Sequence, residues 1–346
     1  MTRSERRLHE WPTAPATGLL PAPETPDIAR IAVDLLGGDD APAVVVDGAL
    51  QACNADPDVF LLLVGPAGVA GEVLAALAPA DRHRVSVCAV DGVVGMADPP
   101  SRGVRDGTSV RAAVAALADG RADAMVSAGA SGAAITAAVH GLGRLPGVRR
   151  PALAATLPAR TGPVVLLDVG ASLDPGSAAL VQHAWLGAAY ARVAHDLPAP
   201  RIGLLSIGAE PGKGDRARRT VAAALAGTPG YVGMVEGYDV PLGGPADVVV
   251  TDGFTGNVLL KGIEAAYALA GGPPPGGRAP RAAALLGVAG TVVVCHGNSS
   301  GADLASGIAL AARLHRIGAR PRLAEAARAR TTDAATEAAR EVGEQT

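Results

Sequence analysis

The feature that most constrains the fold is a series of short apolar runs, most of which end in Gly or Asp. Each run has the length of a buried strand, and most lead into a stretch with the composition of a helix. The runs are IAVDLL, VFLLLVG, RVSVCAV, ADAMVSAG, PVVLLDVG, RIGLLSIG, ADVVVTDG and TVVVCHG. Repetition of strand, glycine turn and helix predicts an α/β fold with a mainly parallel sheet flanked by helices.

The composition indicates what kind of core such a sheet would have. The 346-residue chain is 49% hydrophobic but only 2% aromatic, and it contains 45 glycines. The core is therefore expected to consist of Ala, Val and Leu with closely packed backbones, as in a parallel sheet covered on both faces. The length suits one large domain or two intimately joined ones.

Charge and cysteine usage narrow the possible partners and the compartment. The formal net charge is −3 and the basic residues are scattered, which argues against a nucleic-acid partner. Cys53, Cys88 and Cys295 are widely separated and lack metal-ligand spacing, so we expect free thiols and no metal site. The first residues do not resemble a signal peptide, and no apolar run is long enough to span a membrane. These patterns predict a cytoplasmic protein.

The chain divides by composition into three parts. Residues 1–29 are rich in Pro, Thr, Ala and charge and are expected to form a disordered leader. Residues 30–317 carry the strand and helix patterns of the α/β domain. Residues 318–346 are rich in Ala, Arg and Glu, which predicts a helical tail. Within the domain, the run GGPPPGGRAP at residues 271–280 is expected to be a loop, because its prolines and glycines permit neither helix nor strand.

Two glycine-rich turns at strand ends are candidate anion sites. In a parallel sheet, ligands bind beyond the carboxyl ends of the strands, where backbone amides and helix N-termini gather. Both turns could instead have a purely structural role, since small residues also allow a tight strand-to-helix turn or close packing of a helix on the sheet. The candidate phosphate-binding residues in these turns are Gly37, Gly38, Asp39, Ser127, Gly129, Ser131 and Gly132.

Only two of the 30 basic residues are lysines, namely Lys213 and Lys261. An ammonium group is a compact point charge that a planar guanidinium does not replace, so both are candidates for chemistry. The segment from Gly208 to Gly214 resembles a nucleotide-binding P-loop, but it has three residues between the glycines and Gly after Lys213. Lys213 therefore remains a candidate phosphate or oxyanion ligand, with a solvated surface lysine as the alternative.

The stretch DGFTGNVLLK at residues 252–261 is the most specific candidate site. Asp252 could orient a partner, and Asn257 could donate to a carbonyl or phosphate oxygen, although Asn257 could also be a plain helix cap. Lys261 would lie one helical turn further on. His296, at the end of another strand, could transfer a proton or bind phosphate, whereas His183 on an apolar helix is expected to pack in the core.

Taken together, these segments resemble the ordered motifs of the phosphate acyltransferase (PlsX) family, over roughly residues 30–316. The resemblance implies a three-layer fold like that of isocitrate and isopropylmalate dehydrogenases and phosphotransacetylases, and a homodimer. It also implies transfer of a fatty acyl group from acyl carrier protein to inorganic phosphate, without a cofactor, giving an acyl phosphate for phospholipid synthesis. The matched motifs are VDLLGGDDAP, VSAGASGA, LLDVGASLD, SIGAEPGKG, DVVVTDGFTGNVLLKG and LLGVAGTVVVCHGNSS, and they add Asp168, Gly170, Phe254 and Gly256 as candidate substrate-binding residues.

The chain departs from the family pattern at several positions. The family usually has Asn-Thr where this chain has Ala130 and Ser131, and Asn where it has Ser172. The acidic cluster that precedes the family's lysine is thinned to Glu210. The helical excursion after the GFTGN helix, linked in the family to dimer and membrane contacts, is shortened to residues 271–280, so membrane association is not carried over.

The resemblance leads to a mechanism and leaves two alternatives. Phosphate, held by glycine-loop amides near Gly38, Gly129 and Gly132 together with Lys213, would attack the thioester carbonyl without a covalent enzyme intermediate. Lys261, Asn257 or His296 would stabilise the oxyanion. One alternative is a non-catalytic paralogue that binds acyl carrier protein. The other is an NAD(P)-dependent dehydrogenase on the same fold, which is disfavoured because the turn at residues 65–71 lacks the second glycine of a dinucleotide fingerprint.

Overall fold

The computed structural model describes residues 28–210, 212–274 and 281–330. Within them the chain forms two compact units: unit 1 contains residues 28–142 and 290–318, and unit 2 contains the described residues of 143–289 and 319–330. Nearly all of the expected leader and the second half of the expected helical tail lie outside the described residues, as do residues 275–280 of the proline-rich loop. The first strand already begins at Ala29.

Unit 1 contains a parallel sheet in the order β3-β2-β1-β4-β11. Ile31 on its central strand lies opposite Leu61 on one side and Ala124 on the other. The predicted runs account for all of its strands, which are β1 (Ala29–Asp34), β2 (Val59–Gly65), β3 (Val85–Ala89), β4 (Ala124–Ser127) and β11 (Thr291–Cys295).

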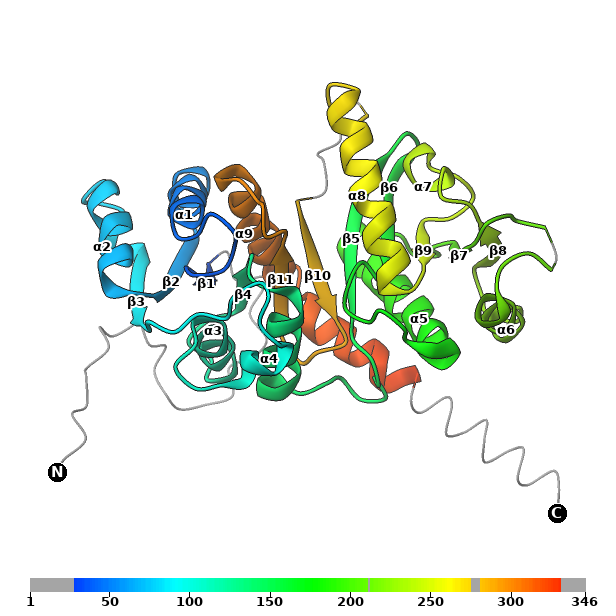
Figure 1. Cartoon of the computed structure of the whole chain (residues 1–346), viewed down its shortest axis with the longest axis horizontal. Helices are drawn as coiled ribbons and strands as arrows, with labels where there is room; N and C mark the ends of the chain where they lie inside the picture. The colour runs from blue at the N-terminus through cyan, green and yellow to red at the C-terminus, as the bar shows by residue number, and fades with distance from the viewer. Residues whose placement is uncertain (1–27, 211, 275–280, 331–346) are drawn as a thin grey trace, which may run out of the picture. The chain divides into compact units, whose positions relative to one another are not determined.

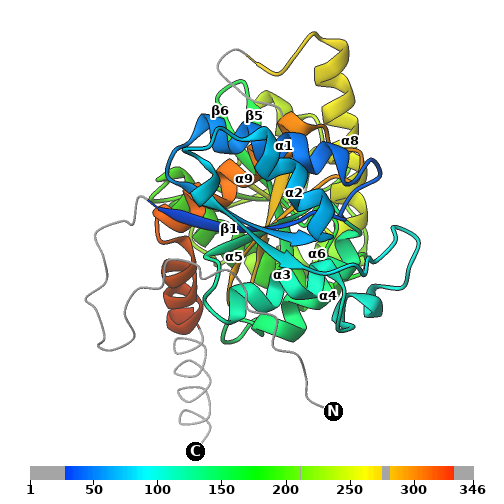
Figure 2. The same ribbon diagram turned by 90° about the vertical axis from the view of Figure 1, so that its left-hand side faces the viewer.

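Helices cover both faces of this sheet. α1, α2 and α9 lie on one face and α3 and α4 on the other (Figures 1 and 2). Two short 3₁₀ helices, Arg82–Arg84 and Pro100–Val104, complete the unit. The α-helices are α1 (Ala43–Ala55), α2 (Ala67–Ala76), α3 (Ser109–Ala118), α4 (Ser131–Leu142) and α9 (Gly301–Arg316).

Unit 2 contains a mixed sheet in the order β10-β5-β6-β9-β7-β8. β6, β9, β7 and β8 run parallel, whereas β5 is antiparallel to both β6 and β10. β5, β8 and β10 are not among the predicted runs; β5 and β10 are rich in Ala, a residue that by itself favours helix. The strands are β5 (Ala152–Ala159), β6 (Gly162–Leu167), β7 (Ile202–Leu205), β8 (Tyr231–Val235), β9 (Val248–Val250) and β10 (Ala282–Leu286).

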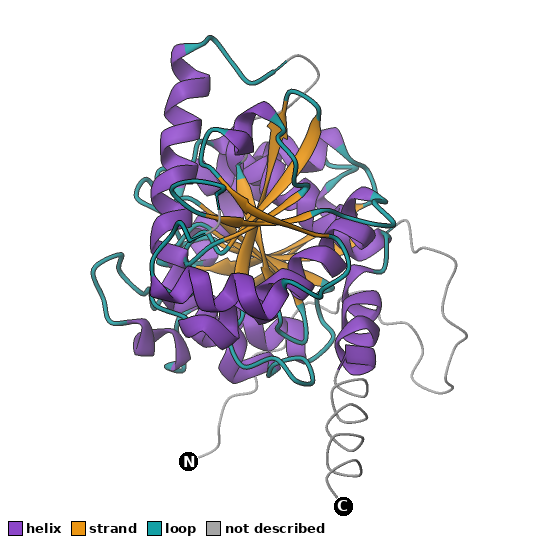
Figure 3. Cartoon of the chain, turned by 90° about the vertical axis from the view of Figure 1, so that its right-hand side faces the viewer, coloured by secondary structure: helices purple, strands orange, loops and turns teal. Residues whose placement is uncertain are grey.

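Helices again flank the strands of unit 2 (Figure 3). A further helix at residues 319–330 begins where the helical tail is expected. None of the helices within the described ranges is both long and apolar enough to cross a bilayer. The expected α/β class with mainly parallel strands is confirmed. The labelled helices of unit 2 are α5 (Gly176–His195), α6 (Arg216–Leu225), α7 (Asp239–Leu242) and α8 (Gly253–Leu269).

Helix α8 approaches the strand ends of unit 2 very closely at one glycine. A Cβ atom on Gly256 would collide with the backbone carbonyl oxygen of Asp168 and lie 2.9 Å from the Thr251 methyl carbon. Gly262, on the same helix, has open space where its Cβ would lie. Of these two glycines, only Gly256 is needed for the close packing of α8 against the backbone of Asp168.

We expect Gly256→Ala and Gly262→Ala to change stability in opposite directions. Gly256→Ala should lower the free energy of unfolding by about 1–3 kcal/mol, because the helix must move away from a rigid carbonyl. Gly262→Ala should raise it by about 0.5–1 kcal/mol, because alanine favours the helix and nothing opposes its methyl group. Urea denaturation of both variants measures this, and equal effects of the two would contradict the assigned close contact.

Candidate functional site

The candidate residues divide equally between the two units. The unit 2 candidates surround the beginning of α8 and the loop after β7. The unit 1 candidates lie in the turns after β1, β4 and β11. Those in unit 1 are Gly37, Gly38, Asp39, Ser127, Gly129, Ser131, Gly132 and His296, and those in unit 2 are Asp168, Gly170, Lys213, Asp252, Phe254, Gly256, Asn257 and Lys261.

The three turns in unit 1 meet at the carboxyl ends of the parallel strands. A Cβ on Gly37 would lie 2.6 Å from the backbone nitrogen of Gly129, so these two turns approach closely. The backbone N–H of Asp39 donates to the Gly297 carbonyl oxygen at 2.7 Å, which joins the turn after β1 to the turn after β11. Gly38 has φ +126, a conformation that favours glycine. The structure thus brings the unit 1 candidates together as expected for a parallel sheet.

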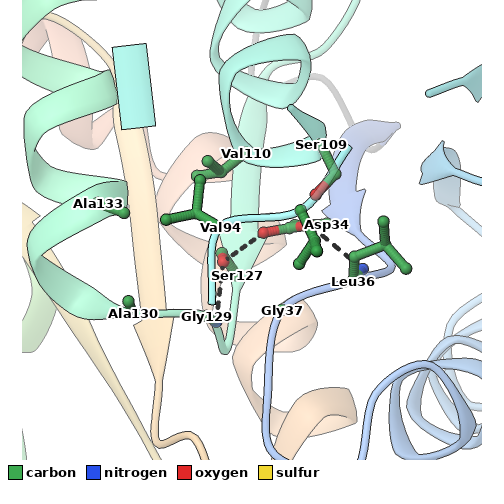
Figure 4. A pocket seen from close by; sticks show the side chains of 11 residues that line it. Asp34, Leu36, Gly37, Val94, Ser109, Val110, Ser127, Gly129, Ala130 and Ala133 are labelled. Atoms are coloured by element: carbon green, nitrogen blue, oxygen red, sulfur yellow. Dashed lines mark hydrogen bonds between the residues drawn. The ribbon is translucent and has the colours of Figure 1, made fainter. Parts of the chain in front are cut away.

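The groups nearest the centre of this cluster hydrogen-bond to one another (Figure 4). The Ser127 hydroxyl donates to the buried Asp34 carboxylate at 2.7 Å and accepts from the Gly129 N–H at 3.1 Å. The cavity beside them has a volume of about 10 Å³, which is room for about one water molecule. The Ser127 hydroxyl and the Gly129 amide therefore hold the turn in shape in this conformation, and the cavity beside them does not accommodate a phosphate ion.

Asp34 is a buried acid that the motif analysis did not select. Burial raises the pKa of its carboxyl group, while hydrogen bonds from Ser109 and Ser127 oppose this increase. An acid in this position would repel a phosphate ion, so we interpret Asp34 as a group that fixes the turns after β1 and β4. The other unit 1 candidates at the start of α4, Ser131 and Gly132, sit at a helix N-terminus, where backbone dipoles favour an anion.

In unit 2, the Asp168 carboxylate organises the turn that follows β6. Its oxygens accept backbone N–H groups from Leu153 at 3.0 Å, Gly170 at 3.1 Å, Ala171 at 2.8 Å and Ser172 at 2.6 Å. Burial raises the pKa of Asp168 to about 6, although these four donors act in the opposite direction. Since the carboxylate is fully buried and its hydrogen bonds shape the backbone, Asp168 positions the site and does not face a substrate.

The turn held by Asp168 is the surface on which the beginning of α8 docks. The Gly253 N–H donates to the Ser172 carbonyl oxygen at 2.8 Å, and the Asn257 side-chain amide donates to the Val169 carbonyl oxygen at 2.9 Å. Gly170 has φ +143, and a Cβ there would lie 3.3 Å from the Asn257 amide nitrogen. Asn257 is therefore fixed against this turn and is not the helix cap, which is Asp252.

Arg218 on α6 connects three elements around the unit 2 candidates. Its guanidinium donates to the Leu205 carbonyl oxygen at the end of β7 (2.9 Å), to the Asp215 carboxylate that caps α6 (2.6 Å) and to the Asp252 carboxylate that caps α8 (2.7 Å). Burial acts to raise the pKa of Asp252, but hydrogen bonds from Thr255 and Arg218 lower it further than burial raises it. The Asp252 carboxylate therefore stays charged. Asp252 thus accepts hydrogen bonds both from the first turn of α8, at the Thr255 N–H, and from Arg218.

The two lysines are exposed, which fits both a role in chemistry and the alternative of a solvated surface lysine. Lys213 lies two residues before Asp215, and its side-chain carbon Cγ would be 3.1 Å from a Cβ on Gly208, so that glycine makes room for the lysine stem. Lys261 lies on α8 one turn beyond Asn257. Arg218 connects the loop that carries Lys213 with the helix that carries Asn257, because it donates to Asp215 and to Asp252.

An apolar cavity of about 560 Å³ opens between these same elements of unit 2. Gly214, next to Lys213, lines it, and so do Phe254 and Val258 on either side of Asn257. A cavity of this size is in the range of small-molecule sites. The loop with Lys213 and the first turns of α8 therefore border one cavity.

Sequence reasoning missed several residues that build the site. Nothing in the sequence distinguishes Arg218 from the other arginines, because its importance comes only from the partners it reaches. Asp215 could have been found as an Asp directly before a helical stretch. Asp34 lies in the motif VDLLGGDDAP, but the glycines after it, Gly37 and Gly38, are the more specific signal for an anion site. Within the described ranges, no group of three His, Cys, Asp or Glu side chains could hold a metal ion.

We expect Asp168→Asn to remove a pH-dependent part of the stability. The pKa of about 6 in the folded protein exceeds the ordinary value of 3.8, so the unfolded chain loses this proton first as the pH rises. Relative to Asp168→Asn, the parent should therefore lose about 2 kcal/mol of unfolding free energy between pH 4.5 and 7. Denaturation of both proteins across this range measures the difference. A constant difference would show that the carboxyl group titrates normally.

Removing the Arg218 side chain should destabilise unit 2 far more than removing a similar surface arginine. Arg218→Ala leaves two carboxylates and a carbonyl oxygen without this donor, and its side chain is only 14% exposed, so we expect a loss of about 2–3 kcal/mol. Arg201 also pairs with a carboxylate, Asp247, but is 49% exposed, and Arg201→Ala should cost at most about 1 kcal/mol. Thermal and urea denaturation compare the two; equal losses would contradict the central position of Arg218.

Comparison with known proteins identifies the family. A family described as "Fatty acid synthesis protein" matches residues 29–271. The phosphate acyltransferase of Thermobifida fusca (strain YX) is 39% identical over 334 residues, covering 87% of this chain and 91% of that protein. That of Ruegeria sp. (strain TM1040) is 43% identical over 252 residues, covering 69% of this chain and 66% of that protein.

Solved structures support the fold. A phosphotransacetylase from Streptococcus pyogenes matches with a TM-score of 0.58 at 16% identity, covering 85% of this chain and 96% of that one. A branched-chain phosphotransacylase from Enterococcus faecalis V583 matches with a TM-score of 0.55 at 15% identity, covering 84% and 99%. The expected three-layer architecture is thus confirmed, and the match to relatives over most of the chain shows that it belongs to the phosphate acyltransferase family.

Proposed function

We propose that this acyltransferase moves a fatty acyl group from the thioester of acyl carrier protein to inorganic phosphate, giving an acyl phosphate for phospholipid synthesis. The observation that carries the proposal is that Gly214, beside Lys213, and Phe254 and Val258, on either side of Asn257, border one apolar cavity. A loop that carries a cationic group and a helix that carries an amide both border this apolar cavity, which suits a reaction that joins an anion to a lipid. The family to which the chain belongs supports the same chemistry.

In the proposed reaction, a phosphate oxygen attacks the thioester carbonyl carbon. A carbon–oxygen bond forms, the carbon–sulfur bond breaks, and the carrier thiolate takes the proton that phosphate releases. Phosphate is already nucleophilic near neutral pH, so the protein's task is to position it and to stabilise the tetrahedral oxyanion.

The candidate residues have different parts in this proposal. Lys213 attracts the phosphate, and Asn257 and Lys261 on α8 stabilise the oxyanion. Asp168 and Asp252 act by positioning Asn257. Asp168 holds the turn against which Asn257 docks, and Asp252 caps the helix that carries Asn257. In unit 1, the amides at the start of α4 and the His296 side chain remain candidates for binding an anion. We also expect a homodimer, as the sequence resemblance implies, and a cytoplasmic location, as the composition of the chain predicts.

Lys213→Ala removes the proposed phosphate ligand and Asn257→Ala removes a proposed oxyanion donor. Each should lower turnover by roughly 100- to 1,000-fold, the usual scale for the loss of one such donor. The assay combines pure protein, acyl carrier protein thioesters and phosphate, and follows both free carrier thiol and trapped acyl phosphate. Arg192→Ala, a change at an exposed position on α5, serves as the control and should keep parental turnover.

Three outcomes would contradict the proposal. Parental turnover in both Lys213→Ala and Asn257→Ala would show that the site is assigned incorrectly. Carrier binding without any thioester cleavage in the parent would favour a non-catalytic paralogue. Stabilisation against heat by NAD or NADP, but not by phosphate, would favour a dehydrogenase.

A further inference from the structure

The apolar cavity of unit 2 has a lining that the fold itself does not require. Ile207 is 81% exposed, Phe254 63% and Val258 59%, and all three border the cavity together with Leu205 and Leu259. Burial of such side chains stabilises a protein, so a cluster of them left in water marks a binding surface. We call these five residues and the space between them the apolar groove.

Helix α8 shows that the groove is separate from the core. Gly256, Leu260 and Ile263 are buried against the strands of unit 2, which accounts for one face of the helix. Phe254 and Val258, four residues apart, form a second apolar face that points away from that core. A helix needs only one apolar stripe to pack on a sheet, so the second stripe serves something other than folding.

The charged groups beside the groove favour an uncharged occupant. Arg218 and Asp215 line the same cavity, but they bond each other. Arg218 also donates to Asp252 and to the Leu205 carbonyl oxygen. An anionic ligand would have to displace these bonds, whereas a hydrocarbon only needs the apolar lining.

We propose that the apolar groove binds the hydrocarbon chain of the acyl donor, an inference that rests on the acyl transfer proposed above. Its volume of about 560 Å³ is in the range of sites for small molecules. Gly214, beside Lys213, lines the groove, and Phe254 and Val258 line it from the helix that carries Asn257. In this proposal the thioester end of the chain lies near Gly214, next to the lysine that attracts the phosphate.

Val258→Asp tests the groove by placing a charge on its wall. Titration of the full-length protein with dodecanoate and with shorter fatty acids, followed by calorimetry, should show affinity rising about fourfold per added methylene in the parent. In Val258→Asp this dependence should flatten, and dodecanoate affinity should fall at least tenfold. The side chain is mostly exposed, so the variant should fold normally, which circular dichroism checks.

Leu269→Asp is the matched control. Leu269 lies on the same helix and is 91% exposed, but it does not line the groove. Leu269→Asp should bind dodecanoate like the parent. With acyl carrier protein thioesters, Val258→Asp should raise KM for long-chain donors and leave KM for phosphate unchanged.

The outcomes separate the two proposals. Chain-length-dependent binding that Val258→Asp abolishes, in a protein that forms no acyl phosphate, would support the groove and overturn the proposed function. Acyl phosphate formation with unchanged chain-length dependence in Val258→Asp would overturn the groove alone. Unchanged dodecanoate binding with a changed oligomeric state, measured by light scattering, would show that a second copy of the chain covers this surface.

Discussion

The candidate site in unit 2 depends on one buried carboxylate. Asp168 accepts four backbone N–H groups, and these bonds give the turn after β6 its shape. Helix α8 begins against this turn, and Asn257 bonds to a carbonyl oxygen within it. Removing the carboxylate would leave several buried donors without partners, which costs more than any single hydrogen bond contributes. The helix start and the amide of Asn257 are therefore positioned through the backbone.

A second set of charges connects the elements that line the apolar cavity of unit 2. Arg218 joins the end of β7, the cap of α6 and the cap of α8. Each of these contacts is ordinary by itself, but together they connect the loop carrying Lys213 to the helix carrying Asn257. Because Arg218 is already bonded to two carboxylates, it leaves the cavity beside it suited to an apolar ligand.

The positions at which the chain departs from the family pattern differ in how much they affect the hydrogen bonds of the candidate site. Position 172, where this chain has Ser in place of Asn, contributes its backbone N–H to Asp168 and its carbonyl oxygen to Gly253. A change of side chain there preserves both bonds. Ala130 and Ser131 lie where α4 begins, so at this position the chain has backbone N–H groups but no side-chain amide to offer an anion.

The sequence by itself determined the fold class, the strand ends that carry the candidate residues, and the family, because alternating apolar runs and glycine turns are local patterns. It also pointed to Asp168 and Asn257, though not to their bonds. Only the tertiary structure decided that Asp252 and not Asn257 caps α8, that Ser127 is engaged by Asp34, and that Arg218 matters among the many arginines. It alone revealed β5 and β10, whose alanines favour helix until neighbouring strands pair with them. The physical reason is the same throughout: a hydrogen bond or ion pair between residues far apart in the chain depends on where the backbone brings them, which no local pattern contains.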